Sequence, residues 1–125
     1  MKKAIAIPNA PAPIGPYSPA VVKGNMLFVS GQIPLNPANG DIEREDIKKA
    51  TKQVMENVKA LVEEAGFAMS DVMKCTIFLT SMADFTDVNE VYGTFFTSEP
   101  PARETVAVKE LPREVRVEIS CIAMK

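Results

Sequence analysis

The longest regular pattern of apolar positions in this chain runs from Asp46 to Ala65. Apolar residues recur there at intervals of three and four, which places them on one stripe of a helix. They are Ile47, Ala50, Val54, Val58, Leu61, Val62 and Ala65. We therefore predict an amphipathic helix over residues 46–65. Gly66 follows it directly and suits the left-handed residue that closes many helices.

Shorter apolar runs on either side of this helix predict strands. One run lies between Met1 and Pro8, and two more, Val21–Lys23 and Met26–Ser30, flank Gly24-Asn25. A two-residue loop with glycine first is typical of a type II′ hairpin turn, so these two runs should pair. A fourth run, over residues 72–80, is rich in β-branched and aromatic residues and predicts a longer strand.

The second half of the chain predicts one more helix and two more strands. Ser81 and Asp84 have the spacing of a helix capping box, with aspartate in place of the usual glutamate or glutamine. The helix should continue to about Phe96. Strands should follow over Glu104–Val108 and Val115–Met124. This order of elements predicts an α+β fold with one mixed or antiparallel sheet and two helices on one face. The apolar side chains that the second helix should bury are Phe85, Val88, Tyr92, Phe95 and Phe96.

The last predicted strand indicates how the two faces of the sheet are used. Alternate positions from Val115 to Ala123 are apolar and should meet the helices, while Glu118, Ser120 and Ile122 share the opposite face. Two helices on one face leave the other face uncovered, although part of it is apolar. We expect self-association to cover it, and a monomer in sedimentation equilibrium at micromolar concentration would contradict this expectation.

A hairpin between the last two strands would bring an arginine and a glutamate together. The loop 109–114 would close this hairpin, and Thr105 would then lie opposite Glu118. By the same register, Arg103 would lie opposite Ser120. All four side chains would project from the face without helices, with Arg103 and Glu118 about 7–8 Å apart at the backbone.

This spacing leaves room for a small carboxylic acid between Arg103 and Glu118. A guanidinium can bind a carboxylate through two parallel hydrogen bonds, and Pro100-Pro101 stiffens the approach to Arg103. Glu118 stands among apolar residues, where burial would perturb its pKa as proton transfer requires. The alternative interpretation is a structural ion pair between the same two side chains.

Composition narrows the classes of function. The chain has 125 residues with 46% hydrophobic and 24% charged positions, which fits one globular domain over residues 1–125. A net charge of −2 argues against nucleic acid or an anionic membrane as a partner. The chain has no histidine, which excludes a Ser-His-Asp triad, and we expect no metal site.

Location and redox state follow from the apolar segments. Cys75 and Cys121 sit inside apolar strand patterns, so we expect two reduced core thiols rather than a disulfide. The first apolar run stops at Pro8, too early for the core of a signal peptide. No run reaches the length of a membrane-spanning helix. We therefore expect a cytoplasmic protein.

Seven short motifs, in order and spread over nearly the whole chain, give it a resemblance to a known family. The motifs are Ile14-Gly15-Pro16-Tyr17-Ser18, Val29-Ser30-Gly31-Gln32-Ile33-Pro34, Asn57-Val58-Lys59, Asp84-Phe85 with Val88-Asn89, Pro101-Ala102-Arg103, Leu111-Pro112 and Val117-Glu118-Ile119. With them the chain resembles the Rid family of enamine and imine deaminases, which includes the YjgF-like proteins, and within it the RidA subfamily.

The resemblance implies a fold, an assembly and a reaction. The fold would be chorismate-mutase-like, in a homotrimer whose sheets form a central barrel and whose active sites lie between subunits. The substrates would be 2-aminoacrylate, 2-aminocrotonate and their imines, which pyridoxal-phosphate dehydratases release from serine and threonine. The products would be 2-oxo acids and ammonia, with no cofactor. Such an enzyme, a 2-iminobutanoate/2-iminopropanoate deaminase, would serve metabolite damage control.

The resemblance also assigns roles to residues of this chain. Arg103 would bind the substrate carboxylate and Glu118 would orient or activate water. Thr105 stands where relatives often carry cysteine, so it can only be a polar wall or a hydrogen-bond partner here. Ser120 stands where many relatives carry a second glutamate. The positions that would line the cleft are Tyr17, Ser30, Gly31 and Asn89.

Two alternatives to the enzyme remain at this stage. The same cleft could belong to a non-catalytic regulatory trimer that binds small carboxylates. Proteins resembling this family have also been described as translation inhibitors or ribonucleases. The acidic balance, the missing histidine and the lack of a basic surface with aromatic residues argue against RNA cleavage.

Overall fold

The computed structural model describes residues 1–125 and contains two α-helices and six strands. Short 3-10 turns precede β4, α2 and β6. The α+β class predicted from the sequence is confirmed. In chain order the elements are β1 Lys3–Ile5, β2 Ala20–Lys23, β3 Met26–Gln32, α1 Ile47–Glu64, β4 Val72–Leu79, α2 Phe85–Gly93, β5 Ala102–Ala107 and β6 Val117–Met124.

The six strands form one mixed sheet in the order β1-β2-β3-β6-β4-β5. Every neighbouring pair is antiparallel except β4 and β5, which run parallel. The predicted hairpin between the last two strands is therefore wrong, because β4 lies between β5 and β6. The physical reason is that α2 connects β4 to β5 as a crossover, and a strand–helix–strand unit makes its two strands parallel neighbours.

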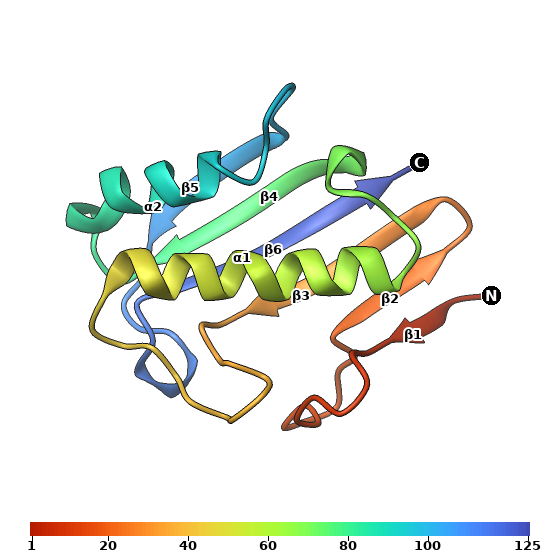
Figure 1. Ribbon diagram of the computed structural model, residues 1–125, viewed down its shortest axis with the longest axis horizontal. Helices are drawn as coiled ribbons and strands as arrows, with labels where there is room; N and C mark the ends of the chain where they lie inside the picture. Colours follow the sequence, from red (N-terminus) through yellow and green to blue (C-terminus); the bar gives the residue numbers. More distant parts are fainter.

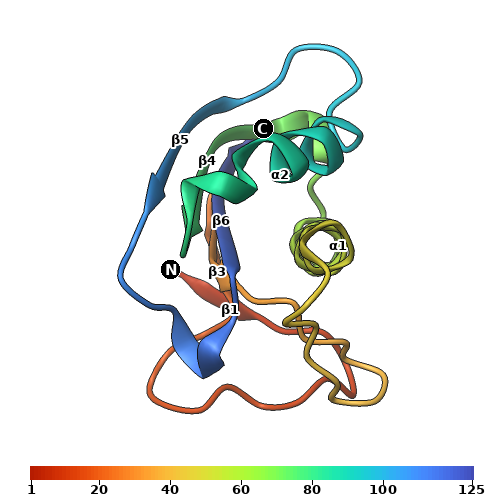
Figure 2. The ribbon, with the colours of Figure 1, turned by 90° about the vertical axis from the view of Figure 1, so that its left-hand side faces the viewer.

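Both helices lie on one face of the sheet, as predicted (Figures 1 and 2). The apolar stripe of α1, including Val54 and Val58, is fully buried against this face. On the sheet side of this core, the alternating residues of β6, including Val117 and Ile119, are also fully buried. Because β6 lies between β3 and β4, its apolar residues occupy the centre of the core, which explains their uninterrupted alternation.

No helix covers the other face of the sheet, which we call the open face (Figure 2). Phe28 on β3, Val106 on β5 and Met124 on β6 have 45%, 46% and 41% of their surface exposed. Scattered apolar side chains are normal on a surface, but three large ones on one sheet face are typical of an interaction surface.

The ends of the helices follow local chemistry. The Asp46 carboxylate accepts hydrogen bonds from the backbone N–H groups of Lys48 and Lys49 at the start of α1. Gly66, directly after the C-cap, has φ of +84°, as expected for a left-handed residue. Gly24 has φ of +59° in the predicted two-residue hairpin turn between β2 and β3. No helix of the structure is both long enough and apolar enough to span a membrane.

The second helix differs from its prediction at both ends. It stops at Gly93 rather than near Phe96. Beyond it, the Thr94 hydroxyl donates a hydrogen bond to the Val91 carbonyl. This side-chain bond competes with the backbone bond that a longer helix would need. At its start Ser81 accepts from the Ala83 N–H, but the Asp84 carboxylate does not close the capping box.

Candidate functional site

Arg103 lies on β5 at the edge of the sheet, on the face that the helices cover. It is in register with Cys75 of β4, which pairs in turn with Cys121 of β6. Both cysteines are buried beneath the helices, and register partners share a face. The Arg103 side chain therefore points toward α2 and away from the open face.

Three residues of α2 hold the Arg103 guanidinium. Its Nη1 donates a hydrogen bond of 2.7 Å to Oδ1 of Asn89. Its central carbon lies 5.7 Å from the ring centroid of Phe85 and 5.1 Å from that of Tyr92, which is within the range of cation–π attraction. Because Phe85, Asn89 and Tyr92 are spaced four and three residues apart, they occupy one face of α2.

The guanidinium keeps donors for a ligand. Arginine has five N–H donors in a planar fork, and Asn89 is the only residue that accepts a hydrogen bond from Arg103. Arg103 and Asn89 were predicted site residues, whereas Phe85 and Tyr92 were predicted to be buried by the second helix and were given no role in the site. The shared helical spacing of Phe85, Asn89 and Tyr92 was the signal that could have identified them.

The two cysteines beneath Arg103 are free, as predicted. Burial raises the pKa of the Cys75 thiol, and this effect outweighs the smaller lowering effects of Tyr92 and Arg103. Burial also raises the pKa of Cys121 to about 12. Both side chains are therefore neutral thiols at pH 7, and neither is an activated nucleophile.

Thr105 lies two residues beyond Arg103 on the same face of β5. It is in register with Ile77 of β4, which pairs with Ile119 of β6. Its hydroxyl oxygen is buried and has no hydrogen-bond partner within the chain. A buried hydroxyl without a partner is uncommon, so this position suits a hydrogen bond to a bound molecule.

Glu118 lies near the start of β6 and on the open face. Its register partner on β4 is Phe78. On the β3 side it lies against Gly31, where an ideal Cβ would be 2.5 Å from the Glu118 Oε2. Burial raises the pKa of the Glu118 carboxyl above its ordinary value, as predicted for a carboxylate among apolar residues. A raised pKa makes this group a better proton acceptor than an ordinary glutamate.

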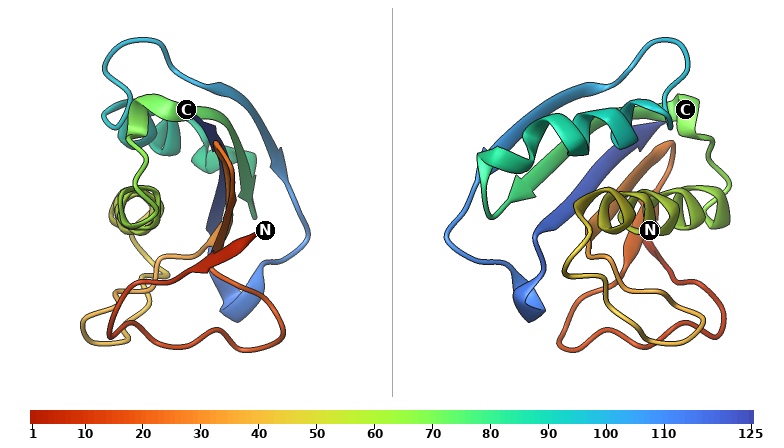
Figure 3. Two further views of the ribbon diagram at one scale, coloured as in Figure 1. Left: turned by 90° about the vertical axis from the view of Figure 1, so that its right-hand side faces the viewer. Right: turned by 60° about the vertical axis from the view of Figure 1, so that its left-hand side comes forward.

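Ser30 lies near the end of β3, next to Gly31, and contacts the coil that carries Tyr17. Ser30 Oγ donates a hydrogen bond of 2.7 Å to the Ser18 carbonyl, and its backbone N–H donates to the Pro19 carbonyl. These bonds fasten the coil between β1 and β2 to the end of β3; the coil lies at one end of the sheet (Figure 3). The neighbouring Tyr17 side chain is 55% exposed.

The structure separates the predicted site residues into two groups. Arg103, Thr105 and Asn89 meet on the helix-covered face at the β5 edge. Glu118 lies two strands away on β6, and Gly31 and Ser30 lie three strands away on β3, next to the coil that carries Tyr17. The predicted placement of Arg103 and Glu118 on one face is therefore wrong, and so is the alternative of an ion pair between them. The cause is that β5 pairs with β4 instead of β6: this register aligns Val106, and not Thr105, with Phe78 and Glu118.

A polar hollow of about 680 Å³ lies between the 34–44 segment and Arg113. None of the seven predicted site residues lines it. One group can bind a carboxylate and the other can accept a proton, so a site using both would have to combine surfaces of two chains.

Comparisons with known proteins identify what this chain is similar to. Residues 7–125 match the model of the family described as Endoribonuclease L-PSP. A RutC family protein of Pyrococcus horikoshii is 50% identical over 125 residues, which is 100% of this chain and 99% of that protein. The 2-iminobutanoate/2-iminopropanoate deaminase of Escherichia coli K12 is 45% identical over 128 residues, again 100% of this chain and 99% of the relative.

Solved structures show the same fold. A Thermotoga maritima protein superposes with a TM-score of 0.95 at 51% identity, covering 100% of this chain and 98% of its own. The structure of Escherichia coli TdcF with bound serine superposes with a TM-score of 0.93 at 42% identity, covering 98% of each chain. These neighbours confirm the chorismate-mutase-like fold predicted from the sequence.

Proposed function

This chain belongs to the Endoribonuclease L-PSP family, which includes the Rid proteins, and from this premise we propose that it hydrolyses small 2-imino acids. The substrates would be the imines of 2-aminoacrylate and 2-aminocrotonate, and the products a 2-oxo acid and ammonia. A relative with 45% identity over the whole chain carries the name of this deaminase.

The observation that carries the proposal is the oriented guanidinium of Arg103. One of its donors is fixed by Asn89 and its central carbon lies 5.7 Å and 5.1 Å from the Phe85 and Tyr92 ring centroids, while its other donors have no partner. Such a fork binds a carboxylate in one orientation. The serine bound to TdcF, a related protein, also carries an α-carboxylate.

Hydrolysis of an imine makes modest chemical demands that these side chains meet. The carbon of a protonated imine is already electrophilic, so the reaction needs a positioned water and a proton carrier. Glu118 takes a proton from water as the water oxygen bonds to the imine carbon. It returns that proton to the nitrogen of the resulting carbinolamine. As the carbon–nitrogen bond breaks, the carbinolamine hydroxyl gives its proton to the Glu118 carboxylate, which leaves the 2-oxo acid and ammonia.

The proposal requires an assembly, which we take to be a homotrimer with its sites between subunits. Arg103 and Glu118 of one chain lie on opposite faces and two strands apart, so one substrate cannot touch both. The exposed apolar side chains of the open face favour contact with a second copy. Thr105, Ser30, Gly31 and Tyr17 would then line the cleft from the two sides.

The direct test supplies the short-lived substrate in place. A pyridoxal-phosphate dehydratase releases 2-aminoacrylate from serine, and the rate of pyruvate formation is compared with and without this protein. We expect faster release with the native protein and none of this acceleration with Arg103→Ala. Arg113→Ala, which alters an exposed arginine outside the proposed groups, should behave as native.

The outcomes separate the proposal from its main alternative. Unchanged pyruvate release with folded native protein would overturn the deaminase. Binding of 2-oxobutanoate without acceleration would instead support a regulatory carboxylate-binding protein. Full activity in Arg103→Ala would remove the role given to Arg103 even if the deaminase activity were confirmed.

A further inference from the structure

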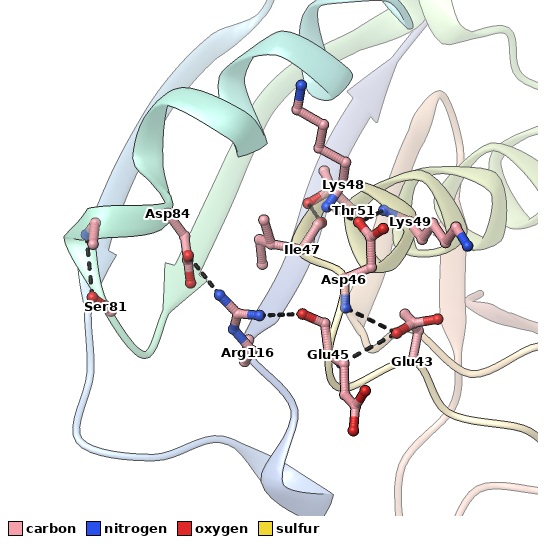
Figure 4. Close-up of polar contacts among 11 residues, drawn as sticks. Glu43, Glu45, Asp46, Ile47, Lys48, Lys49, Thr51, Ser81, Asp84 and Arg116 are labelled. Atoms are coloured by element: carbon pink, nitrogen blue, oxygen red, sulfur yellow. Dashed lines mark hydrogen bonds and ion pairs between the residues drawn. The ribbon is translucent and has the colours of Figure 1, made fainter.

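Arg116 joins three parts of the chain that are distant in sequence (Figure 4). Its Nη2 lies 2.7 Å from Oδ1 of Asp84, just before α2, and its Nη1 donates to the Glu45 carbonyl, just before α1. Its own carbonyl accepts from the Thr80 N–H at the end of β4. One residue therefore fixes where two helices and two strands of the fold meet.

The ion pair between Arg116 and Asp84 is the most enclosed of the chain. Asp84 is only 8% exposed, while the other ion pairs, such as Lys48 with Glu90, join side chains that are about half exposed. Exposed pairs contribute little because water screens them, but a buried carboxylate depends on its partner.

Helix capping does not account for Asp84. Its position three residues after Ser81 suggested a capping box, but its carboxylate makes no hydrogen bond to the backbone at the start of α2. It faces Arg116 instead (Figure 4). The buried acid at this position therefore contacts Arg116, directly before β6, rather than capping the helix.

The pair connects the two groups of the candidate site. Asp84 directly precedes Phe85, and α2 then presents Asn89 to Arg103. Arg116 stands two residues before Glu118 on the same chain segment. A change in the distance between Asp84 and Arg116 would shift the helix that orients the guanidinium relative to the strand that carries the carboxylate.

We propose that Arg116 and Asp84 are positioning residues, which hold α2 against the start of β6 so that Asn89 presents the Arg103 guanidinium to a substrate carboxylate. This inference rests on the proposed function for its substrate class. It assigns neither residue a contact with the substrate. The fork of Arg116 matters, because a lysine has no planar pair of donors for Asp84 and the Glu45 carbonyl at once.

A double-mutant cycle tests the inference. The dissociation constant for 2-oxobutanoate is measured by calorimetry for the native protein, Asp84→Asn, Asn89→Ala and the double variant. We expect Asp84→Asn to weaken binding roughly tenfold, since a small misplacement of a binding group is costly. In the Asn89→Ala background the same change should have less than about a twofold effect, because coupled residues are not additive.

Two further variants guard against a general loss of structure. Arg116→Lys keeps the positive charge, and a second cycle of this variant with Asn89→Ala should show the same coupling in binding. The urea midpoint of Arg116→Lys reports whether it folds. Glu90→Gln removes the exposed ion pair between α1 and α2, next to Asn89, and should bind as native. Additive effects in both cycles, or native binding by both Asp84→Asn and Arg116→Lys, would overturn the inference.

The same experiment distinguishes the inference from the proposed function. A native protein that binds 2-oxobutanoate but does not accelerate imine hydrolysis would refute the deaminase, while the cycle on binding still decides the role of Arg116 and Asp84. A native protein that neither binds the 2-oxo acid nor turns over the imine would overturn both.

Discussion

The Glu118 carboxylate occupies the space that a side chain at Gly31 would need. An ideal Cβ at Gly31 would lie 2.5 Å from Oε2 and 2.7 Å from the carboxyl carbon of Glu118. Gly31 does not have a positive φ, so backbone conformation does not require glycine there. The close approach of the carboxylate does.

Gly31→Ala should therefore damage activity more than stability. The added methyl group would push the Glu118 carboxylate aside, and we expect turnover of the imine to fall roughly tenfold to a hundredfold. Gly93→Ala is the matched control, because a Cβ there meets nothing within 4 Å. Steady-state rates and melting temperatures of both variants check this, and native turnover by Gly31→Ala would contradict it.

Asn89→Ala should weaken substrate binding through Arg103. It removes the only acceptor that orients the guanidinium, and a hydrogen bond to a charged group contributes about 1.5–3 kcal/mol. We expect the Michaelis constant to rise roughly tenfold or more while turnover at saturation changes less. Thr86→Ala, at an exposed position of the same helix, should be kinetically native; equal Michaelis constants for both variants would contradict the role of Asn89.

Glu118→Gln should raise stability at neutral pH. Burial raises the Glu118 pKa above the ordinary value of 4.5, so the folded protein favours the protonated carboxyl. That stabilisation is present below the unfolded pKa and is lost as the pH rises through the folded pKa. Glutamine keeps the neutral form at every pH. The variant should melt above the native protein at pH 7, with the difference shrinking toward pH 4, and a lower melting temperature at pH 7 would contradict the prediction.

Two inactive variants should restore activity when mixed. Arg103→Ala retains Glu118, and Glu118→Gln retains Arg103. If sites form between chains, refolding an equal mixture should give trimers in which about one site in four has both native residues. Each variant refolded alone is the control. The absence of recovered pyruvate formation in a mixture shown to exchange subunits would argue against sites shared between chains.

Asn57→Ala should destabilise the fold without a direct effect on chemistry. The Asn57 amide nitrogen on α1 donates to the carbonyls of Ile33 and Leu35 at 3.1 and 2.8 Å. Losing a donor to two partly buried carbonyls should lower the free energy of unfolding by about 2 kcal/mol. Urea denaturation measures this. Asn39→Ala, in an exposed turn, should stay within about 0.5 kcal/mol of native.

The amino-acid sequence by itself determined the elements, because their signals are local. The apolar stripe from Ile47 to Val62 can bury itself only as a helix, and the alternation from Val117 to Ala123 only as a strand with one face in a core. Asp46 and Gly66 marked the ends of α1 correctly. Individual site residues were also visible as unusual types in their surroundings, such as Glu118 among apolar neighbours.

The tertiary structure alone decided which strands are neighbours. Strands β5 and β6 are consecutive in the chain, so a hairpin satisfied every local rule. Pairing is a competition for long-range hydrogen bonds, and β4 occupies the place beside both strands. That outcome placed Arg103 beneath α2 and Glu118 on the open face. Arg103 and Glu118 thus remain the carboxylate-binding and proton-accepting candidates that the sequence indicated. Their separation follows from the strand order, which no local pattern encodes.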